Sequence, residues 1–279
     1  MTRAAADLDE LADLAEGVAQ EAGALLLGYY EDGAPSAGLA ASIRSKSTRT
    51  DLVTEADRAS ENLIVDRLRA RRPDDAILAE EGASRDGPSG LTWVVDPLDG
   101  TINFVYGFPA FCVSIACVSG DERLVGVVFD PVRRETFRAR RGGGASRNGT
   151  PLRLGDGPAL SEALVATGFG YAAERRRSQA ELLETMLPQV RDIRRAGAAA
   201  LDLCWLASGR VDAYFEAGLA PWDLAAGALV VTEAAGAVEL LEGIVPGAAT
   251  VVAGPRRLEQ ELAGLLGRAR LEAGRRSAR

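Results

Sequence analysis

An apolar run that ends in an acid constrains this chain more than any other stretch. Trp93-Val94-Val95 is typical of a buried strand. Pro97 lacks an N–H, so regular pairing of this strand is expected to stop at Asp96. The strand is therefore expected to end in a carboxylate.

A second acid follows three residues later, next to the start of a predicted helix. Asp99 and Thr101 flank Gly100, so either side chain can cap the helix, and the glycine lets a ligand approach the backbone. Carboxylates on a tight turn repel each other unless a cation holds them, and a helix N-terminus attracts an anion such as phosphate. The stretch indicates a metal ion and a phosphate. Taken alone, two aspartates that merely cap a turn explain it equally well.

The composition excludes several kinds of catalysis. The chain of 279 residues contains no histidine, which rules out Ser-His-Asp and Cys-His catalysis and His-ligated zinc. Catalysis must then rest on carboxylates, hydroxyls, Lys, Arg or an oxygen-bound metal. The net charge of −8 and the sequence pI of about 4.9 argue against nucleic acid as the main partner, because no global positive field would attract it.

The cysteines and the N-terminus indicate a cytoplasmic protein. Cys112, Cys117 and Cys204 are odd in number and lie in apolar runs, so we expect buried thiols in a reducing compartment. The N-terminus is acidic, and no apolar run reaches the roughly 18 residues that a membrane helix needs. We therefore expect neither a signal peptide nor a membrane span.

The first half of the chain predicts an α+β lobe with an antiparallel sheet. Apolar residues at helical spacing run from Leu8 to Leu26, and a polar surface loop follows at 32–50. In order, the later patterns predict a helix stopped by Pro73, a strand at 76–79 closed by Glu80-Glu81, a hairpin over 111–129 and a strand at 135–139. Gly142-Gly143-Gly144 lacks the Gly-Lys-Ser/Thr of a phosphate loop and predicts a turn.

The second half alternates strands and helices, which predicts an α/β lobe. The expected strands are 163–167, 190–194 and 211–216, each followed by a helix. We expect an N-terminal lobe at 1–155, a C-terminal lobe at 156–267 and a disordered basic tail at 268–279. Arg175-Arg176-Arg177 predicts a solvated helix face.

Further acids also lie at the ends of predicted strands or at the start of a predicted helix. Glu80 follows one strand, Glu216 ends another, and Asp223 falls in the first turn of an apolar helix. Asp223 alone could simply complement the helix dipole, and adjacent acids such as Glu80-Glu81 are commonly exposed. Their repetition in a chain without histidine favours a functional cluster.

Taken together, these stretches resemble the inositol monophosphatase family of magnesium-dependent, lithium-sensitive phosphatases. The resemblance covers roughly 46–254 and rests on residues 51–57, 80–81, 96–101 with Asn103-Phe104, 197–200 and 222–227. It implies a layered αβαβα sandwich of the inositol monophosphatase/fructose-1,6-bisphosphatase type, consistent with an α+β lobe followed by an α/β lobe. It also implies a homodimer.

The resemblance implies a set of metal ligands. Glu80, Asp96 and the Leu98 carbonyl would hold one Mg²⁺, and Asp96, Asp99 and Asp223 would hold a second. Glu80 with waters would hold a third, weaker ion, and Li⁺ would act as an inhibitor. Oxygen ligands without His or Cys also favour Mg²⁺ over zinc on chemical grounds.

The resemblance also implies roles around the substrate. Thr101 paired with Asp57 would orient the attacking water, with Glu80 nearby. The N–H groups of Gly100 and Thr101 and the side chain of Lys46 would bind the phosphate, and Asp99, Ala199 and Glu216 would contact cyclitol hydroxyls. Ala220 stands where some relatives carry a histidine, which leaves the metal ligands intact but makes the substrate less certain.

We therefore expect hydrolysis of a small phosphate ester, with myo-inositol 1-phosphate or a similar cyclitol or sugar phosphate as the substrate. Alternatives within the superfamily are fructose 1,6-bisphosphate, histidinol phosphate and a 3′-phosphonucleotide. An alternative of another class is a regulatory protein that binds RNA polymerase or RNA. The intact acidic residues and the negative charge argue against that as the sole role.

Overall fold

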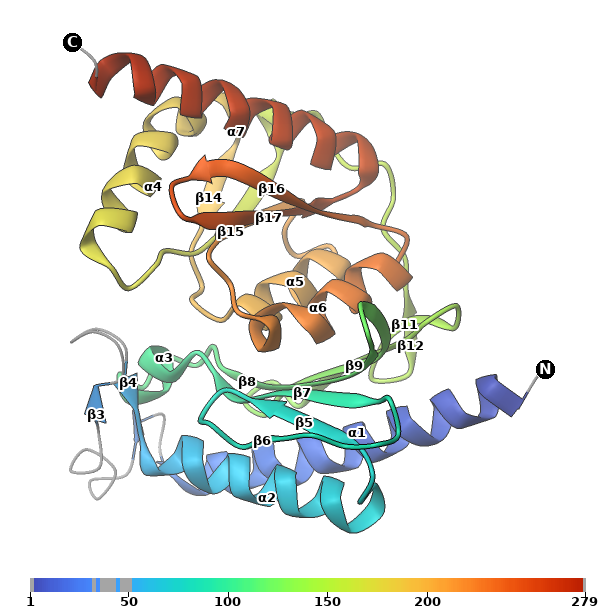
Figure 1. The fold of residues 1–279 in the computed structure, drawn as a ribbon. Helices are drawn as coiled ribbons and strands as arrows, with labels where there is room; N and C mark the ends of the chain where they lie inside the picture. The colour runs from blue at the N-terminus through green and yellow to red at the C-terminus, as the bar shows by residue number, and fades with distance from the viewer. Residues whose placement is uncertain (1–2, 32–33, 36–43, 46–51, 278–279) are drawn as a thin grey trace.

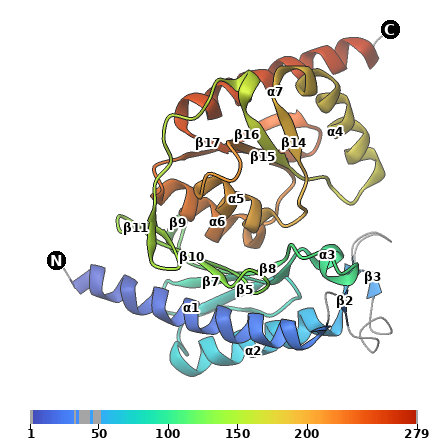
Figure 2. The ribbon, with the colours of Figure 1, turned by 180° about the vertical axis from the view of Figure 1, so that it is seen from behind.

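The protein, described by a computed structural model for residues 3–31, 34–35, 44–45 and 52–277, is a stack of five layers (Figure 1). From bottom to top in Figure 1 these are helices α1 and α2, an eight-stranded sheet, helices α5 and α6, a five-stranded sheet, and helices α4 and α7. Figure 2 shows the same order from behind. The predicted αβαβα sandwich is confirmed.

The helices are α1 (Arg3–Gly28), α2 (Glu55–Arg71), α3 (Thr101–Val105), α4 (Ala173–Met186), α5 (Ala199–Ala207), α6 (Pro221–Glu233) and α7 (Arg256–Ser277), with 3-10 turns at Leu160–Glu162 and Leu187–Gln189. The large sheet contains, in spatial order, β12 (Thr150–Leu152), β11 (Gly144–Arg147), β10 (Glu135–Arg140), β9 (Glu122–Asp130), β8 (Cys112–Ser119), β7 (Thr92–Asp99), β5 (Ala76–Ala79) and β6 (Ser84–Arg85). The small sheet contains β14 (Asp192–Arg194), β13 (Leu164–Thr167), β15 (Ala213–Ala217), β17 (Ala248–Gly254) and β16 (Ala237–Val245). Two small ribbons pair β1 (Tyr30–Glu31) with β2 (Ala34–Pro35) and β3 (Arg44–Ser45) with β4 (Leu52–Val53).

Side-chain alternation along β7 separates two hydrophobic cores. Trp93 and Val95 pack in the core shared with α1 and α2, whereas Val94 packs in the core beneath α5 and α6. Because alternate residues of a strand face opposite sides, Asp96 lies on the same face as Val94. A third core joins the outer face of the small sheet to α4 and α7. The sequence pattern thus directs Asp96 toward the centre of the sandwich.

Strand β7 extends further than predicted. Its pairing with β8 is regular up to Asp96 and resumes at Asp99, which lies opposite Cys112, with a register shift between. Pro97 falls in the shift, where a missing N–H costs no ladder bond. The helix cap also differs from the prediction: Gly100, with φ +92°, occupies the N-cap of α3 and contributes no side chain.

Three other predictions need correction. Strands β5 and β7 are parallel, so the large sheet is not wholly antiparallel; the connection between them places β6 on the outer side of β5. In the small sheet, β16 and β17 add antiparallel pairs to the parallel β13, β14 and β15. Residues 268–277 continue α7, because Ala269 and Ala273 extend the buried stripe of that helix at helical spacing. The division into lobes at residue 155 stays a prediction.

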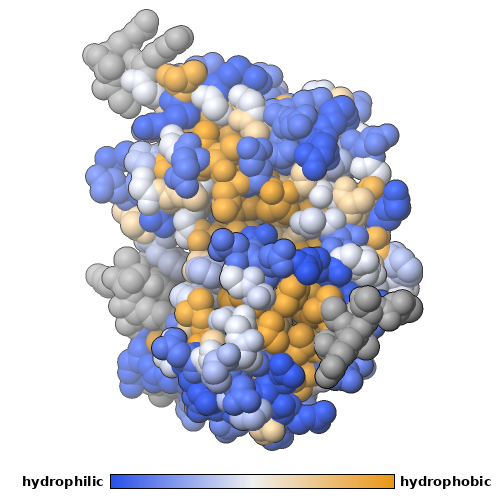
Figure 3. Space-filling view, turned by 45° about the vertical axis from the view of Figure 1, so that its right-hand side comes forward, coloured by the Kyte–Doolittle hydropathy of each residue, from blue (hydrophilic) through white to orange (hydrophobic). Residues whose placement is uncertain are grey.

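The cysteines are buried, as expected. Cys112, Cys117 and Cys204 are buried, unpaired thiols. Within the described residues, no helix combines the length and apolarity needed to cross a bilayer. On the face in Figure 3, hydrophobic residues gather above and below a hydrophilic band, the mixed surface that folded proteins commonly expose. The predicted loop at 32–50 lies almost wholly outside the described residues.

Replacement of Gly126 tests the contact between the large sheet and α6. A Cβ at this position would lie 2.8 Å from the Ala226 carbonyl oxygen and 2.9 Å from its Cα. We expect Gly126→Ala to lower the free energy of unfolding by about 1–3 kcal/mol through overpacking. The control, Gly17→Ala on the exposed side of α1, has nothing within 4 Å of the added atom and should stabilise the protein by about 0.5–1 kcal/mol. Denaturant titration compares them, and equal stability of the two variants would contradict the close packing.

Glu259 makes stability depend on pH. It is 2% exposed at the start of α7, and burial together with its contact to Glu239 raises its pKa to about 7. A raised carboxyl pKa means that the folded state holds a proton that the unfolded state has lost, so stability falls as pH rises from about 4.5 to above 7. We expect Glu259→Gln to raise Tm increasingly between about pH 5 and about pH 8. Exposed Glu242→Gln is the control, and a pH-independent effect of Glu259→Gln would contradict the account.

Candidate active site

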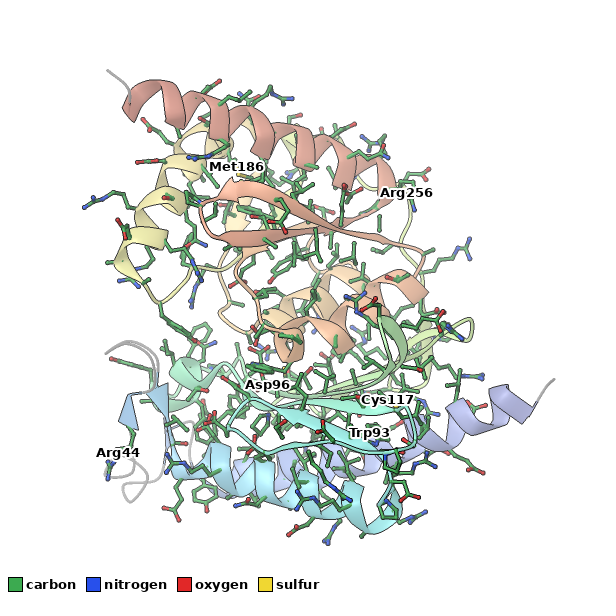
Figure 4. The ribbon with its side chains drawn as sticks, in the orientation of Figure 1. Arg44, Trp93, Asp96, Cys117, Met186 and Arg256 are labelled. Carbon is green, nitrogen blue, oxygen red and sulfur yellow. The ribbon has the colours of Figure 1, made fainter. Side chains whose placement is uncertain are left out.

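The acid turn, residues 96–101, is held in place by its own backbone and by α2. Asp96 Oδ1 accepts a hydrogen bond of 3.0 Å from the Leu98 N–H. Ser60 Oγ on α2 donates to the Pro97 carbonyl at 2.8 Å. Asp96 is 1% exposed, and Figure 4 shows it at the level of the large sheet, beneath the α5–α6 layer. The acid turn therefore places its first carboxylate inside the protein.

Asp99 connects the acid turn to the start of α5. Its Oδ1 accepts from the Ala199 N–H at 3.2 Å, and its Oδ2 accepts from the Ala200 N–H at 2.8 Å. The Cys112 thiol lies 3.6 Å from Oδ2. The first amides of a helix lack intrahelical acceptors, so a buried carboxylate satisfies them well. Ala199, predicted to contact substrate, is thus also a backbone partner of Asp99.

Thr101 and Asp57 are hydrogen-bonded, as the resemblance implies. Thr101 Oγ1 lies 2.9 Å from Asp57 Oδ1 and 3.1 Å from the Leu98 carbonyl. The other carboxylate oxygen of Asp57 accepts from the N–H and the hydroxyl of Thr54, at 2.8 and 2.5 Å. Thr54 also caps α2, and together the two residues form a capping box. Our sequence reasoning missed Thr54, although the Thr-x-x-Asp spacing is a signal for such a box.

Two further acids come from the C-terminal half. Glu216 lies on the same face of β15 as Tyr214, whose hydroxyl donates to Glu216 Oε2 at 2.8 Å. Asp223, in the first turn of α6, accepts from the Ala220 N–H at 2.7 Å. The hydrogen bond from Tyr214 to Glu216 was not predicted, because a tyrosine within an apolar strand is usually a residue of the hydrophobic core.

These carboxylates repel one another. Burial raises the pKa of Asp96 well above its usual range, and the charges of Glu80, Asp99 and Asp223 raise it further. Burial likewise raises the pKa of Asp99 to about 7, against the lowering effect of the Ala200 amide. Burial also raises the pKa of Glu216 to about 7. Each shift means that negative charge here is unfavourable without a compensating cation.

A pocket of about 310 Å³ brings most of the predicted residues together. Those that line it are Glu80, Asp99, Gly100, Ala199, Glu216 and Asp223. Asp57, Asp96, Leu98 and Thr101 are buried and do not line it. Arg175 and Arg195 also line it, and neither was predicted to do so. Lys46 lies outside the described residues.

A larger pocket of about 490 Å³ lies elsewhere, beside the Gly142–Gly144 turn, and contains none of the predicted site residues. There the N–H groups of Gly142 and Gly144 donate to the Glu233 carboxylate at 2.8 and 2.9 Å. The glycine turn thus binds a carboxylate of the same chain, Glu233, which agrees with the prediction that residues 142–144 form a turn and not a phosphate loop.

The donor set suits a hard divalent cation, since it consists only of carboxylate and carbonyl oxygens. The raised pKa values of the buried acids are also consistent with a cation between them. Across residues 52–277 and the shorter described segments, however, no three acidic or cysteine side chains already stand in a metal-coordinating arrangement. The ligand set Glu80, Asp96, Leu98, Asp99 and Asp223 therefore stays a prediction.

Comparison with known proteins decides the family. The model of the inositol monophosphatase family matches residues 7–271. The chain belongs to this family. It is therefore a phosphatase, as the sequence resemblance predicted.

Two curated relatives are similar over most of the sequence. Inositol-1-monophosphatase SuhB of Mycobacterium tuberculosis is 44% identical over 282 residues, which cover 95% of this chain and 96% of the relative. Nus factor SuhB of Pseudomonas aeruginosa is 45% identical over 208 residues, which cover 72% of this chain and 76% of the relative.

Solved structures support the same assignment. Mycobacterium tuberculosis SuhB matches with a TM-score of 0.77 and 40% identity, covering 94% of this chain and 97% of that chain. SaIMPase-II, solved with inositol monophosphate bound, matches with a TM-score of 0.74 and 28% identity, covering 91% and 92%. Another solved structure in the comparison is that of inositol monophosphatase-II from Staphylococcus aureus.

The Thr101 hydroxyl can be tested by replacement with an isosteric side chain. Thr101→Val removes the donor to buried Asp57 Oδ1. If this pair positions the attacking water, kcat should fall by at least about a hundredfold. Loss of this hydrogen bond to a buried oxygen should also cost about 1–3 kcal/mol of stability. Thr101→Ser keeps the hydroxyl and should retain most activity in steady-state phosphate release; loss of activity in both variants, or in neither, would contradict this role.

Proposed function

We propose that this phosphatase hydrolyses myo-inositol 1-phosphate or a similar cyclitol or sugar phosphate in a magnesium-dependent reaction. The observation that carries the proposal is the meeting of Glu80, Asp99 and Asp223 in one pocket, whose wall includes Gly100, the neighbour of Thr101 in the buried Asp57–Thr101 pair. The relatives named inositol-1-monophosphatase and the SaIMPase-II structure with bound inositol monophosphate support this substrate class.

The acids would hold Mg²⁺ in two or three sites. Glu80, Asp96 and the Leu98 carbonyl are the proposed ligands of one ion, Asp96, Asp99 and Asp223 those of the second, and Glu80 that of a third. Bound there, Mg²⁺ would supply Lewis-acid stabilisation of the phosphoryl oxygens and a lowered pKa for the attacking water. Because the chain has no histidine, no imidazole base competes for that role.

Thr101 and Asp57 would orient the attacking water. Asp57 is fixed by Thr54 on one oxygen, so its second oxygen is held in place for the Thr101 hydroxyl. That hydroxyl donates its proton to Asp57, which leaves a lone pair on Oγ1 that can accept a hydrogen bond from water. The pair thus favours one orientation of the nucleophile, with Glu80 nearby. The first amides of α3, those of Gly100 and Thr101, would bind the phosphate together with Lys46.

Glu216 would recognise substrate hydroxyls. Tyr214 occupies one of its oxygens and leaves the other to accept from a ligand. Ala220, at the pocket wall, adds no polar group of its own. Fructose 1,6-bisphosphate, histidinol phosphate and 3′-phosphonucleotides remain the competing substrates. Phosphate release measured across this panel with Mg²⁺ tests the choice, and a clear preference for one of these competing esters would overturn it.

A regulatory role is a second candidate function. The observation in its favour is the similarity to a relative named Nus factor SuhB. Such a role would involve binding RNA polymerase or RNA, and the net charge of −8 argues against RNA as a direct partner. Absence of turnover on every ester in the panel, together with binding to RNA polymerase, would favour it.

We further propose a cytoplasmic homodimer. The unpaired buried cysteines suit a reducing compartment, and the family resemblance implies the dimer. Light scattering of the purified protein tests the oligomeric state.

Asp96→Asn tests the metal site. Asp96 would be a ligand of both proposed ions, so its neutralisation should nearly abolish turnover even at saturating Mg²⁺, while the fold survives. Loss of like-charge repulsion should leave Tm in EDTA unchanged or higher. Exposed Asp66→Asn on α2 is the control and should remain active.

In the wild-type enzyme, EDTA should abolish phosphate release, and lithium salts at millimolar concentration should inhibit it. Turnover of Asp96→Asn at the wild-type rate, or full activity in EDTA, would refute the metal assignment. Indifference to lithium would refute the inhibitor assignment.

A further inference from the structure

Two arginines line the same pocket as Glu80, Asp99 and Asp223. Arg175 comes from the start of α4, and Arg195 from the loop between β14 and α5. Glu80, Asp99 and Asp223 come from the large sheet and α6. The proposed mechanism uses neither arginine, so their presence in the same pocket needs a separate explanation.

Arg175 differs from its two arginine neighbours on α4. Arg176 is exposed and donates to the carbonyls of Gly170 and Tyr171 at 3.1 and 2.7 Å, which holds the loop before the helix. Arg177 is exposed. Arg175 alone is half-buried and lines the pocket. The predicted solvated face therefore holds for two of the three arginines and is wrong for Arg175.

The backbone makes room for both guanidinium groups. A Cβ on Gly218 would lie 2.5 Å from Nη1 of Arg175, and a Cβ on Gly197 would contact Nη1 of Arg195. Gly218 and Gly197 have φ values of +81° and +91°, a conformation that favours glycine. Both arginines thus lie against glycines at the pocket wall, where bulkier residues would displace them.

Neither arginine is neutralised by a direct partner in the described part of the chain, which offers each no hydrogen bond and no ion pair within 4.0 Å. Burial raises the pKa values of Glu216 and Asp202, and the charge of Arg195 opposes this rise, so its field reaches these buried acids. A guanidinium beside a pocket and without a carboxylate partner suits an anionic group of a ligand.

We infer that Arg175, assisted by Arg195, binds a second anionic group of the substrate, so that the enzyme selects phosphomonoesters carrying another phosphate or a carboxylate away from the scissile ester. This inference rests on the proposed function and narrows its substrate class. The acids of the pocket would hold the metal ions at the phosphate to be hydrolysed, and the two arginines would receive the second anion. Arg175 is then a specificity-determining residue that contacts the substrate.

The test compares myo-inositol 1-phosphate with myo-inositol 1,4-bisphosphate, which shares the ring and adds one phosphate. The wild-type enzyme should have the higher kcat/KM on the bisphosphate. Arg175→Gln should lower that value at least about tenfold, equivalent to about 1.4 kcal/mol, mainly through KM. Its kcat/KM on the monophosphate should change less than about threefold. Arg195→Gln should act in the same direction.

Controls separate charge from structure. Arg177→Gln, on the same helix turn but exposed, should leave kcat/KM on both esters unchanged. Arg175→Lys should retain part of the preference for the bisphosphate, because it keeps the charge. Equal losses on both esters, or a wild-type enzyme that prefers the monophosphate, would overturn the inference. If neither ester is hydrolysed, the proposed function fails, while calorimetric titration of the bisphosphate in Mg²⁺ still tests the subsite. Equal affinity of wild type and Arg175→Gln would then overturn it.

Discussion

The burial of several carboxylates at one point is the constraint on which this structure depends. Asp96 and Asp57 are almost fully buried, and Asp99 is 8% exposed. Isolated buried charges are costly, so each carboxylate must find donors. Asp57 accepts hydrogen bonds from Thr54 and Thr101, and Asp99 accepts hydrogen bonds from the first amides of α5. These bonds join α2, the large sheet and α5 around the site.

The layer arrangement follows from the same requirement. The register shift in β7 releases residues 97 and 98 from the ladder, and Asp99 then returns to pairing close to the start of α5. The α5–α6 layer packs on both sheets, so it can bring Asp223 and the neighbourhood of Glu216 toward the acid turn. A sandwich with helices in its centre thereby gathers acids from both halves of the chain.

Much of this could be predicted from local patterns. The alternation of Trp93, Val94 and Val95 predicted a buried strand, and the acids at strand ends and at a helix start predicted a cluster. The Thr101–Asp57 bond follows the family resemblance. What was missed depends on long-range geometry or on patterns with common alternatives. The parallel pairing of β5 and β7 cannot be deduced from either strand alone, and Arg175 was taken for one of three solvated arginines. The helical tail was missed because its buried alanines are weak signals beside many arginines.

Direct measurement of Mg²⁺ binding tests most closely whether the buried acids form a magnesium site. Isothermal titration calorimetry on metal-free wild-type protein should show saturable Mg²⁺ binding, accompanied by proton release, because acids with raised pKa values must ionise to bind the ion. The Tm of the protein, measured at increasing Mg²⁺ concentrations, should rise as Mg²⁺ saturates the site. Absence of saturable heat and of any Tm increase would contradict the claim.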